Sequence, residues 1–522
     1  MTQSEFYNAA DDLLQRNIDA GRGDKVTIVD DDGGHTHNEL VDRVHRCANA
    51  LREFGLGPGQ RILLCLFDSI DFHTSFLGAI KAGVVPVPLN TLWTSSDYAH
   101  VLVDSGAAAV IVSEARLPVL LDAAQSVGWN GRVILSASRR QNNHALLTQL
   151  LGSAAPRAET FQSHPDDVCF WLYSSGSTGK PKAAVHRQTS MAMTARLFGQ
   201  GVLSLNENDV TYSAAKLFFA YGLGNSLSFP LYTGATVVLH GGRTLPPVVN
   251  AILREKRPTL FCGVPTLYSS LLATADLPKA GEHNLRLCIS AGEPLPEHVG
   301  QAWQERTGVE IVDAPGSTEM LHCFVSNRPG AVRYGTSGQP VPGYKVKLVD
   351  DGGSEVHAGE IGELWVSGPT SCAYYWNHPE KSQSTFVGEW TRTGDKYRQD
   401  SLGDLVFCGR GDDMLKVGGI WVSPLEVESV LVSHEAVLEA VVVGSSDENG
   451  LVKPRAFVVV KAGILPNDEL KQKLKDFVKD KLAPYKYPRW VQFVPELPKT
   501  ATGKVQRFRL RQLARDDSSE RA

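Results

Sequence analysis

An eleven-residue stretch reads Tyr173-Ser174-Ser175-Gly176-Ser177-Thr178-Gly179-Lys180-Pro181-Lys182-Ala183. An apolar, strand-like run from Val168 to Leu172 precedes it. Glycine lets backbone N–H groups approach a ligand closely, while hydroxyls and lysines add donors and positive charge. The stretch therefore predicts a polyphosphate-binding loop that follows a strand.

The spacing inside this stretch differs from that of a Walker A loop. A Walker A loop has four residues between its glycines and Ser or Thr after its lysine. Here two residues separate Gly176 from Gly179, and Pro181 follows Lys180. Proline offers no hydroxyl to Mg²⁺, so this is not a Walker A loop. A flexible Gly/Ser surface loop is the alternative.

Composition bounds the class of protein. A chain of 522 residues predicts several domain-sized units, or one large domain with a small one. The net charge of −5 gives no basic field that would indicate nucleic acid as a partner. The 8 cysteines form no CxxC pair, which argues against a zinc site and favours a reducing, cytoplasmic setting. We expect neither a signal peptide nor a membrane span, since no long apolar run occurs.

Strand-like and helix-like segments alternate along the first two thirds of the chain. The expected strands are 61–67, 84–89, 108–112, 132–135, 236–239, 259–261 and 285–290. Helical periodicity covers 38–54, 71–81 and 247–254. Such alternation predicts an α/β fold with parallel-rich sheets and flanking helices. From Lys345 to Val366 the pattern changes to a small antiparallel β part, with a turn at 350–353.

A composition break near 410–413 precedes a smaller α+β segment. Strands are expected at 440–443, 455–461 and 490–494, and an amphipathic helix from about Asp468. Residues 453–511 hold 15 Lys/Arg against 5 Asp/Glu, a local balance of +10. Solvated helix faces account for most of these lysines, yet the surplus would favour an anionic nucleotide.

Four further stretches occur in a fixed order: Asp313-Ala314-Pro315-Gly316-Ser317-Thr318-Glu319-Met320, Thr393-Gly394-Asp395 with Gly409-Arg410-Gly411-Asp412-Asp413, Lys416-Val417-Gly418-Gly419-Ile420-Trp421, and Pro498-Lys499-Thr500-Ala501-Thr502-Gly503-Lys504. The first three have structural alternatives: a turn that caps a helix for the first, an ordinary turn for the second and a β-hairpin turn for the third. Together with the eleven-residue stretch they resemble the acyl-adenylate-forming enzymes, which include acyl- and aryl-CoA ligases, luciferases and amino-acid adenylation domains. The resemblance covers nearly the whole chain from about residue 20.

The resemblance implies ATP, Mg²⁺ and CoA as cofactors and assigns roles to residues. Thr318 would bind phosphate and Glu319 would hold Mg²⁺. Asp395 and Arg410 would contact the ribose, and Lys504 would span the carboxylate and the α-phosphate, two anions that repel each other. The remaining nucleotide and CoA contacts would be Ser174, Ser175, Gly176, Ser177, Thr178, Gly179, Lys180, Gly292, Glu293, Pro294, Asp313, Gly418 and Gly419, the last two on a pantetheine tunnel.

The implied organisation is a large N-terminal domain over 1–411 and a mobile C-terminal lid over 412–522, with the hinge near Asp412. ATP and an acid would give an acyl-AMP and pyrophosphate, and CoA would then displace AMP after the lid turns. A stand-alone enzyme that loads a carrier protein is the runner-up, and a catalytically silent homologue is a third reading. The sequence leaves monomer or homodimer open.

Two stretches bear on the acid. Lys216-Leu217-Phe218-Phe219-Ala220-Tyr221-Gly222-Leu223-Gly224-Asn225 and Met320-Leu321-His322 look like those of benzoate-type aryl-CoA ligases. By resemblance, the pocket is lined by Phe219, Ala220, Tyr221, Ala291, His322 and Cys323. A structural role for His322 is the alternative. Close benzoate ligases tend to carry isoleucine at the position of Cys323, so we expect room for an amino or hydroxyl substituent on the ring.

Overall fold

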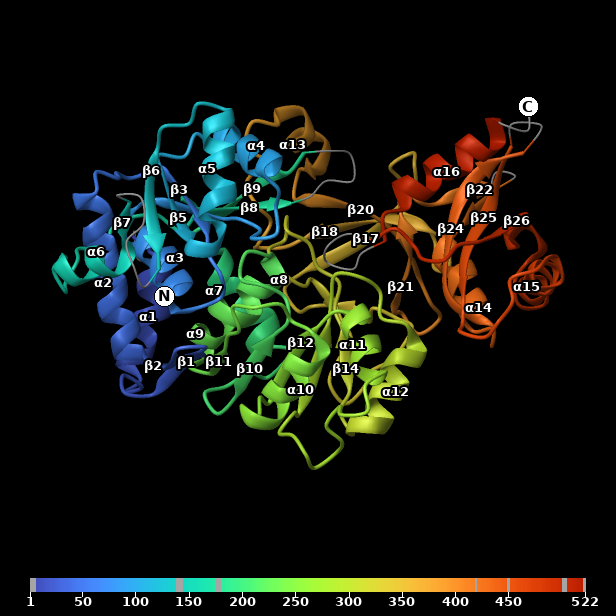
Figure 1. Ribbon diagram of the computed structural model, residues 1–522, viewed down its shortest axis with the longest axis horizontal. Coiled ribbons are helices and arrows are strands. Elements are labelled where there is room, and N and C mark those ends of the chain that lie inside the picture. Colours follow the sequence, from blue (N-terminus) through green and yellow to red (C-terminus); the bar gives the residue numbers. More distant parts are fainter. Residues whose placement is uncertain are drawn as a thin grey trace. The chain divides into compact units, whose positions relative to one another are not determined.

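The computed structural model describes residues 6–137, 144–174, 180–417, 420–447, 451–499 and 505–519. The chain forms two compact units, and Figure 1 labels most of their helices and strands. The first unit consists of Met1–Lys345 with Val366–Thr391, and the second of Val346–Trp365 with Arg392–Ala522. The expected lid boundary between residues 411 and 412 concerns which parts move, and it stays a prediction.

The first unit contains a parallel sheet of five strands in the order β4-β3-β5-β6-β7. Its strands are β3 (Arg61–Cys65), β4 (Val85–Pro88), β5 (Ala109–Ser113), β6 (Arg132–Ser136) and β7 (Ala145–Leu146), and its helices are α2 (His37–Glu53), α3 (Ile70–Ala82), α4 (Ser95–Ser105), η1 (Glu114–Arg116), α5 (Leu117–Ser126) and α6 (Leu147–Ser153). Ile62 and Leu64 pack with α2 and α3, whereas Leu63 packs with α4 and α5. Helices therefore cover both faces of this sheet, as the alternating pattern predicts.

A second sheet of the first unit has seven strands in the order β14-β13-β12-β10-β11-β1-β2, and only the β1–β2 pair is antiparallel. Its strands are β1 (Val26–Asp30), β2 (Gly33–Thr36), β10 (Val210–Ser213), β11 (Thr236–Val238), β12 (Leu260–Gly263), β13 (Leu287–Ser290) and β14 (Ile311–Asp313). The helices of this part are α1 (Ala9–Asp19), α7 (Ser190–Thr194), η2 (Ala195–Gln200), α8 (Ala220–Leu223), η3 (Gly224–Ser228), α9 (Phe229–Thr233), α10 (Pro246–Glu255), α11 (Pro265–Leu272) and α12 (Glu297–Thr307).

A hairpin carries the eleven-residue stretch. Strands β8 (Val168–Ser174) and β9 (Lys182–Arg187) pair antiparallel, so the predicted loop connects them. The first unit is completed by the pair β15 (Val325–Ser326) and β16 (Gln339–Pro340), by α13 (Pro379–Thr385) and by β19 (Phe386–Val387), which pairs with the start of β20 (Trp390–Gln399).

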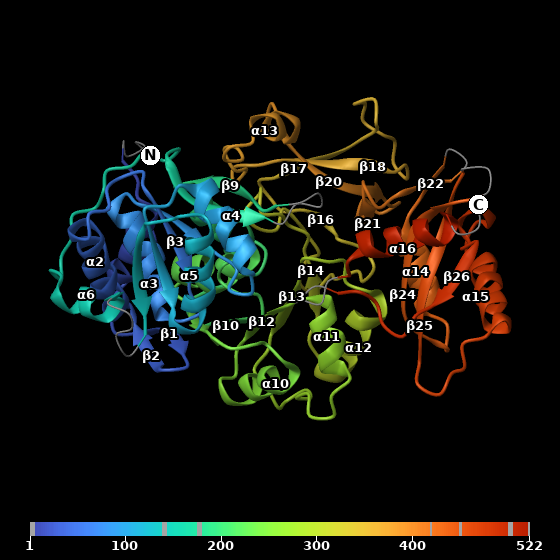
Figure 2. The same ribbon diagram turned by 45° about the horizontal axis from the view of Figure 1, so that its top comes forward.

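The second unit is mostly antiparallel. Its elements are β17 (Lys345–Val349), β18 (Gly362–Ser367), β20, β21 (Leu405–Arg410), the hairpin β22 (Leu415–Val417) and β23 (Ile420–Val422), α14 (Pro424–Val432), β24 (Val437–Ser446), β25 (Val452–Val460), α15 (Asp468–Lys481), η4 (Pro484–Lys486), β26 (Trp490–Phe493) and α16 (Arg507–Ser519). Asn467 caps α15 by accepting from the amide of Leu470, and Leu474 and Val478 are buried on its inner face. Helix α15 lies beside β26 (Figure 2), so the predicted amphipathic helix is confirmed.

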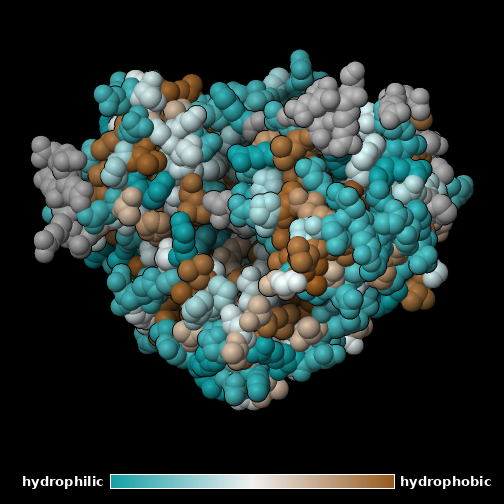
Figure 3. Space-filling view, turned by 45° about the vertical axis from the view of Figure 1, so that its right-hand side comes forward, coloured by the Kyte–Doolittle hydropathy of each residue, from teal (hydrophilic) through white to brown (hydrophobic). Residues whose placement is uncertain are grey.

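Hydrophilic residues predominate on the face drawn in Figure 3, with hydrophobic residues in scattered groups between them. Singly exposed apolar side chains, such as Leu402 and Leu465, are normal for a globular protein. No helix within the described ranges is long and apolar enough to cross a membrane.

Candidate active site

Several candidate residues lie at the carboxyl ends of neighbouring strands. Strands β12, β13 and β14 are parallel and adjacent, and their register pairs Gly263 with Ser290 and Ser290 with Asp313. Ala291 and Gly292 follow directly on Ser290. Ligands of open α/β sheets bind beyond the carboxyl ends of the strands, so the topology favours a site at this edge.

Aromatic rings gather next to this edge, and we call those of Phe198, Tyr221, Phe229 and His322 the ring cluster. The His322 ring centroid lies 5.5 Å from that of Tyr221 and 4.6 Å from that of Phe229. The Phe198 centroid is 5.3 Å from that of His322. The Tyr221 hydroxyl donates a 3.2 Å hydrogen bond to the carbonyl oxygen of Ile289, which ties the cluster to β13.

His322 is a neutral member of this cluster. Its side chain is buried, and burial lowers its pKa to about 3, while the backbone of Tyr221 acts in the opposite direction. Gly224 makes room for it, because a Cβ atom there would lie 2.3 Å from Cδ2 of His322. The cluster is therefore uncharged and aromatic, a composition that suits a flat apolar group rather than an ion.

The backbone before His322 is folded tightly. Leu321 has a φ of +66°, a left-handed conformation that costs a residue with a side chain roughly 1–2 kcal/mol. Gly316 forms a β-bridge with Cys323, and a Cβ atom at Gly316 would lie 2.7 Å from the carbonyl oxygen of His322. The alternative interpretation of residues 313–320 as a turn that caps a helix is wrong. Among the described residues, the next helix after this stretch is α13, which begins only at Pro379.

Asp313 and Cys323 lie close to the ring cluster. Burial raises the pKa of Asp313 to about 8, opposed by the backbone amide of Leu295. Burial, and after it neighbouring groups that include the Asp313 carboxyl, raise the pKa values of Tyr221 and Cys323. The Cys323 thiol is buried and donates to the carbonyl oxygen of Ala314 at 3.0 Å. The structure thus brings predicted nucleotide and acid residues into one neighbourhood.

Glu319 contacts an aromatic residue that the sequence reasoning missed. The Tyr375 hydroxyl donates to Oε1 of Glu319 at 2.6 Å, and the amide of Cys372 donates to the Glu319 carbonyl at 2.7 Å. Nζ of Lys182 lies 4.0 Å from the centroid of the Tyr375 ring. Tyr375 therefore links β9, at the end of the predicted phosphate loop, to Glu319. No local pattern marks this contact, because the two residues lie far apart in the sequence.

The donor set at Glu319 fits Mg²⁺. No cluster of three or more acidic, His or Cys side chains suited to a metal occurs among the described residues. Mg²⁺ in ATP-dependent enzymes is held by one or two carboxylates together with phosphates and water, so a single carboxylate is a sufficient protein ligand. Glu319 keeps an oxygen that has no hydrogen-bond partner in the described part of the chain.

Asp104 was also missed by the sequence reasoning. It accepts a 2.6 Å hydrogen bond from the Tyr173 hydroxyl at Oδ2, and its carbonyl oxygen accepts from Nε1 of Trp376 at 3.0 Å. One residue at the end of α4 thereby holds both the start of the eleven-residue stretch and the segment that carries Tyr375. No local pattern marks Asp104, because its partners lie far away in the sequence.

The other predicted residues of the first unit differ in burial. Phe219 is 38% exposed, with its ring centroid 4.5 Å from that of Phe218, and Ala220 is half-buried. Ala291 is buried, while Gly292 has a φ of +90° and begins the segment of Glu293 and Pro294. Ser174 ends β8, Lys180 is exposed, and Thr318 precedes Glu319 in the tight turn. Predicted residues that lie outside the described ranges are Ser175, Gly176, Ser177, Thr178, Gly179, Gly418, Gly419 and Lys504.

In the second unit, Asp395 and Arg410 face each other across β20 and β21. Nη1 of Arg410 lies 2.8 Å from Oδ1 of Asp395, and the Arg410 side chain is 47% exposed. Asp412 is exposed, and its carbonyl oxygen accepts a 3.4 Å hydrogen bond from Arg511. Strands β22 and β23 pair antiparallel, which agrees with the hairpin reading of residues 416–421.

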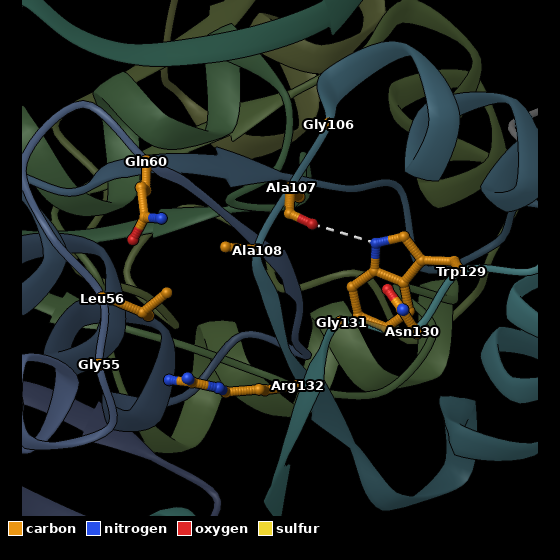
Figure 4. A pocket seen from close by; sticks show the side chains of 10 residues that line it. All are labelled: Gly55, Leu56, Gln60, Gly106, Ala107, Ala108, Trp129, Asn130, Gly131 and Arg132. Atoms are coloured by element: carbon orange, nitrogen blue, oxygen red, sulfur yellow. Dashed lines mark hydrogen bonds between the residues drawn. The ribbon is translucent and has the colours of Figure 1, made fainter.

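A cavity of about 390 Å³ lies elsewhere in the first unit. Its lining includes Gln60 before β3, Ala108 before β5, Trp129 before β6 and Arg132 at the start of β6 (Figure 4). These are the amino ends of the strands, opposite to the edge at which α/β sheets bind ligands. None of the predicted site residues lines it, so we place the candidate site at the ring cluster and Glu319.

Comparison with protein families matches residues 14–376 to the AMP-binding enzyme family and residues 426–504 to the AMP-binding enzyme C-terminal domain. The chain is 55% identical over 509 residues to a benzoate–CoA ligase from Thauera aromatica, covering 97% of this chain and 96% of the relative. It is 46% identical over 513 residues to a 4-hydroxybenzoate–CoA/benzoate–CoA ligase from Rhodopseudomonas palustris, covering 97% and 94%. Among solved structures, the chain resembles the anthranilate CoA ligase AuaEII, crystallised in complex with anthranoyl-AMP. The two sequences are 42% identical, and the structures superpose with a TM-score of 0.92 over 99% of each chain.

Proposed function

The chain belongs to the AMP-binding enzyme family, and we propose that it is an ATP-dependent aryl-CoA ligase for benzoate-type acids. The observation that carries this proposal is the neutral ring cluster beside the sheet edge that bears Asp313. The named relatives act on benzoate and 4-hydroxybenzoate, or were crystallised with anthranoyl-AMP, which supports a one-ring acid.

The reaction has two steps. A carboxylate oxygen of the acid attacks the α-phosphorus of ATP, and the bond to the pyrophosphate oxygen breaks. The CoA thiolate then attacks the acyl carbon of the aryl-AMP, the bond to the AMP oxygen breaks, and the thioester forms. Mg²⁺, when bound, neutralises phosphate charge.

Residue roles follow the resemblance and are part of the proposal. Glu319 would hold the metal, and Thr318 and the loop from Ser174 to Lys180 would bind phosphates. Lys504 would lie between the two reacting anions in the first step. Asp395 and Arg410 would bind the ribose, and their existing cross-strand pair supports this by holding both side chains in one place. Gly418 and Gly419 would line the tunnel for the pantetheine arm of CoA once the C-terminal lid has rotated about the hinge near Asp412.

The ring substituent depends on the space near Cys323. Its thiol is smaller than an isoleucine side chain, so an amino or hydroxyl group on the ring would be accepted. A gap of this size discriminates by only about 1–3 kcal/mol, so we expect 2-aminobenzoate or a hydroxybenzoate to be used beside benzoate.

Steady-state kinetics of CoA thioester formation with benzoate, 2-aminobenzoate, 4-hydroxybenzoate and octanoate test the proposal. The expected result is that kcat/KM for an aryl acid exceeds that for octanoate by about 100-fold or more. A preference for octanoate would remove the aryl assignment. Release of pyrophosphate without thioester, together with transfer to a phosphopantetheinylated carrier, would favour the carrier-loading alternative, and absence of pyrophosphate release would favour a silent homologue.

The cysteines support a reducing, cytoplasmic setting. All of them are free and buried, so none forms a disulfide. A monomer and a homodimer are both compatible with this proposal.

A further inference from the structure

A buried carboxylate lies outside the residues that the resemblance marks. Asp68 is 4% exposed and sits in the turn between β3 and α3. A carboxylate is costly to bury unless it is paired and hydrogen-bonded. Its partners therefore show what the residue is for.

Two of those partners, Lys216 and Leu217, are the first residues of the segment that carries the predicted acid pocket. Oδ1 of Asp68 accepts a 3.1 Å hydrogen bond from the amide of Leu217. Oδ2 lies 3.9 Å from Nζ of Lys216, whose ammonium also donates to the carbonyl oxygen of His240. His240, Asp31 and Tyr212 are the other ionisable groups in electrostatic contact with the Asp68 carboxylate. Loops from both parallel sheets of the first unit thus meet at this carboxylate.

The segment after Lys216 has little freedom of its own. The amide of Phe219 donates to the Lys216 carbonyl at 3.0 Å. A Cβ atom at Gly222 would lie only 2.0 Å from that same carbonyl oxygen. The main chain at Lys216 and Leu217 therefore sets where Tyr221, between Phe219 and Gly222, enters the ring cluster.

We propose that Asp68 is a positioning residue for the acid pocket, which fixes the start of segment 216–222 and thereby the wall that Tyr221 forms. This inference rests on the proposed function, because its kinetic test measures the use of the aryl acid. Asp68 does not touch the reacting atoms, and it acts through the main chain of Leu217 and the ammonium of Lys216.

The test compares Asp68→Asn with Asp209→Asn in the full-length protein. Asp209 is a matched control, since it is also buried and paired, with Arg286 at 2.7 Å, but it precedes β10 at the opposite end of the strand from the site. We expect Asp68→Asn to lower kcat/KM for the best acid about tenfold while KM for ATP stays within about twofold. Asp209→Asn should lower the melting temperature and leave both kinetic constants near those of the wild type.

Equal changes in the two variants, or a loss that falls on ATP rather than on the acid, would overturn the inference. A crystal structure of Asp68→Ala gives a readout that does not depend on activity: segment 216–222 should be displaced, and an unmoved segment would also overturn it. If the proposed function is wrong, the wild-type enzyme will prefer a non-aryl acid. The two variants are compared on the acid that the wild type prefers, so this comparison tests Asp68 independently of the proposed function.

Discussion

The ring cluster and the Asp395–Arg410 pair place polar groups by different means. In the ring cluster, His322 is held by burial, by ring packing and by a Gly224 that leaves it room. Asp395 and Arg410 are held by the register of two antiparallel strands, with Arg410 largely open to solvent. Exposed ion pairs contribute about 0–1 kcal/mol, whereas buried packing contributes several kcal/mol. Substitutions in the ring cluster should therefore change stability and function together, and those of Asp395 or Arg410 should change function alone.

The largest expected effect comes from Lys504→Ala. Removing one preorganised contact to a transition state lowers the rate by about 10²–10³, so formation of aryl-AMP should fall by this factor while melting temperature is unchanged. Pyrophosphate exchange measures the first step. Thioester formation from synthetic aryl-AMP should survive, and a parallel loss of both steps would contradict the role given to Lys504.

Gly224→Ala tests the other side of the comparison. The added methyl group would press on His322, and overpacking of this kind costs about 1–3 kcal/mol. Denaturant unfolding should show this loss, and KM for the acid should rise about tenfold as the ring cluster shifts. Gly152→Ala is the control: it lies in α6 with open space around it, so stability should be unchanged or slightly higher. If KM for the acid in Gly224→Ala equals that of the wild type, the ring cluster is not part of the acid-binding site.

Asp313 predicts a pH dependence of acid binding. With a pKa of about 8 this carboxyl is mostly protonated at pH 7, and it becomes negative as the pH rises further. The acid is itself an anion, so its KM should rise by roughly three- to tenfold between pH 7 and pH 9. His322, with a pKa of about 3, should add no step in this range. Asp313→Asn should abolish the rise, and its persistence in that variant would assign it to another group.

The smallest expected effect is that of Arg410→Ala. The pair with Asp395 is exposed, so unfolding free energy should change by less than about 1 kcal/mol. KM for ATP should rise about fivefold through the lost contact to the ribose, with KM for the acid unchanged. Isothermal titration calorimetry with ATP measures the expected loss of nucleotide affinity. A stability loss as large as that of Gly224→Ala would break the comparison.

Local patterns predicted much of the fold. Helix α15 and the alternation of β3, α3 and β4 follow from periodicity and from capping by Asn467 and Gly83. The resemblance marked Glu319, Asp395 and residues 216–225 as candidates for the site. It could not reveal contacts between residues far apart in sequence.

Such long-range contacts include those of Tyr375 with Glu319, of Asp104 with Tyr173 and of Asp68 with Leu217. The left-handed backbone of Leu321 was equally hidden, since leucine gives no signal for that conformation. These features arise from tertiary packing, which overrides local preference. They lie in or beside the candidate site, where departures from local rules are expected.

The most direct test of the central claim is a crystal structure of the protein with a non-hydrolysable benzoyl-adenylate analogue. We predict that the aromatic ring of the analogue lies against Tyr221 and His322, with its phosphate near Glu319. An aromatic ring bound in another part of the protein, with the ring cluster still closed, would contradict the proposal.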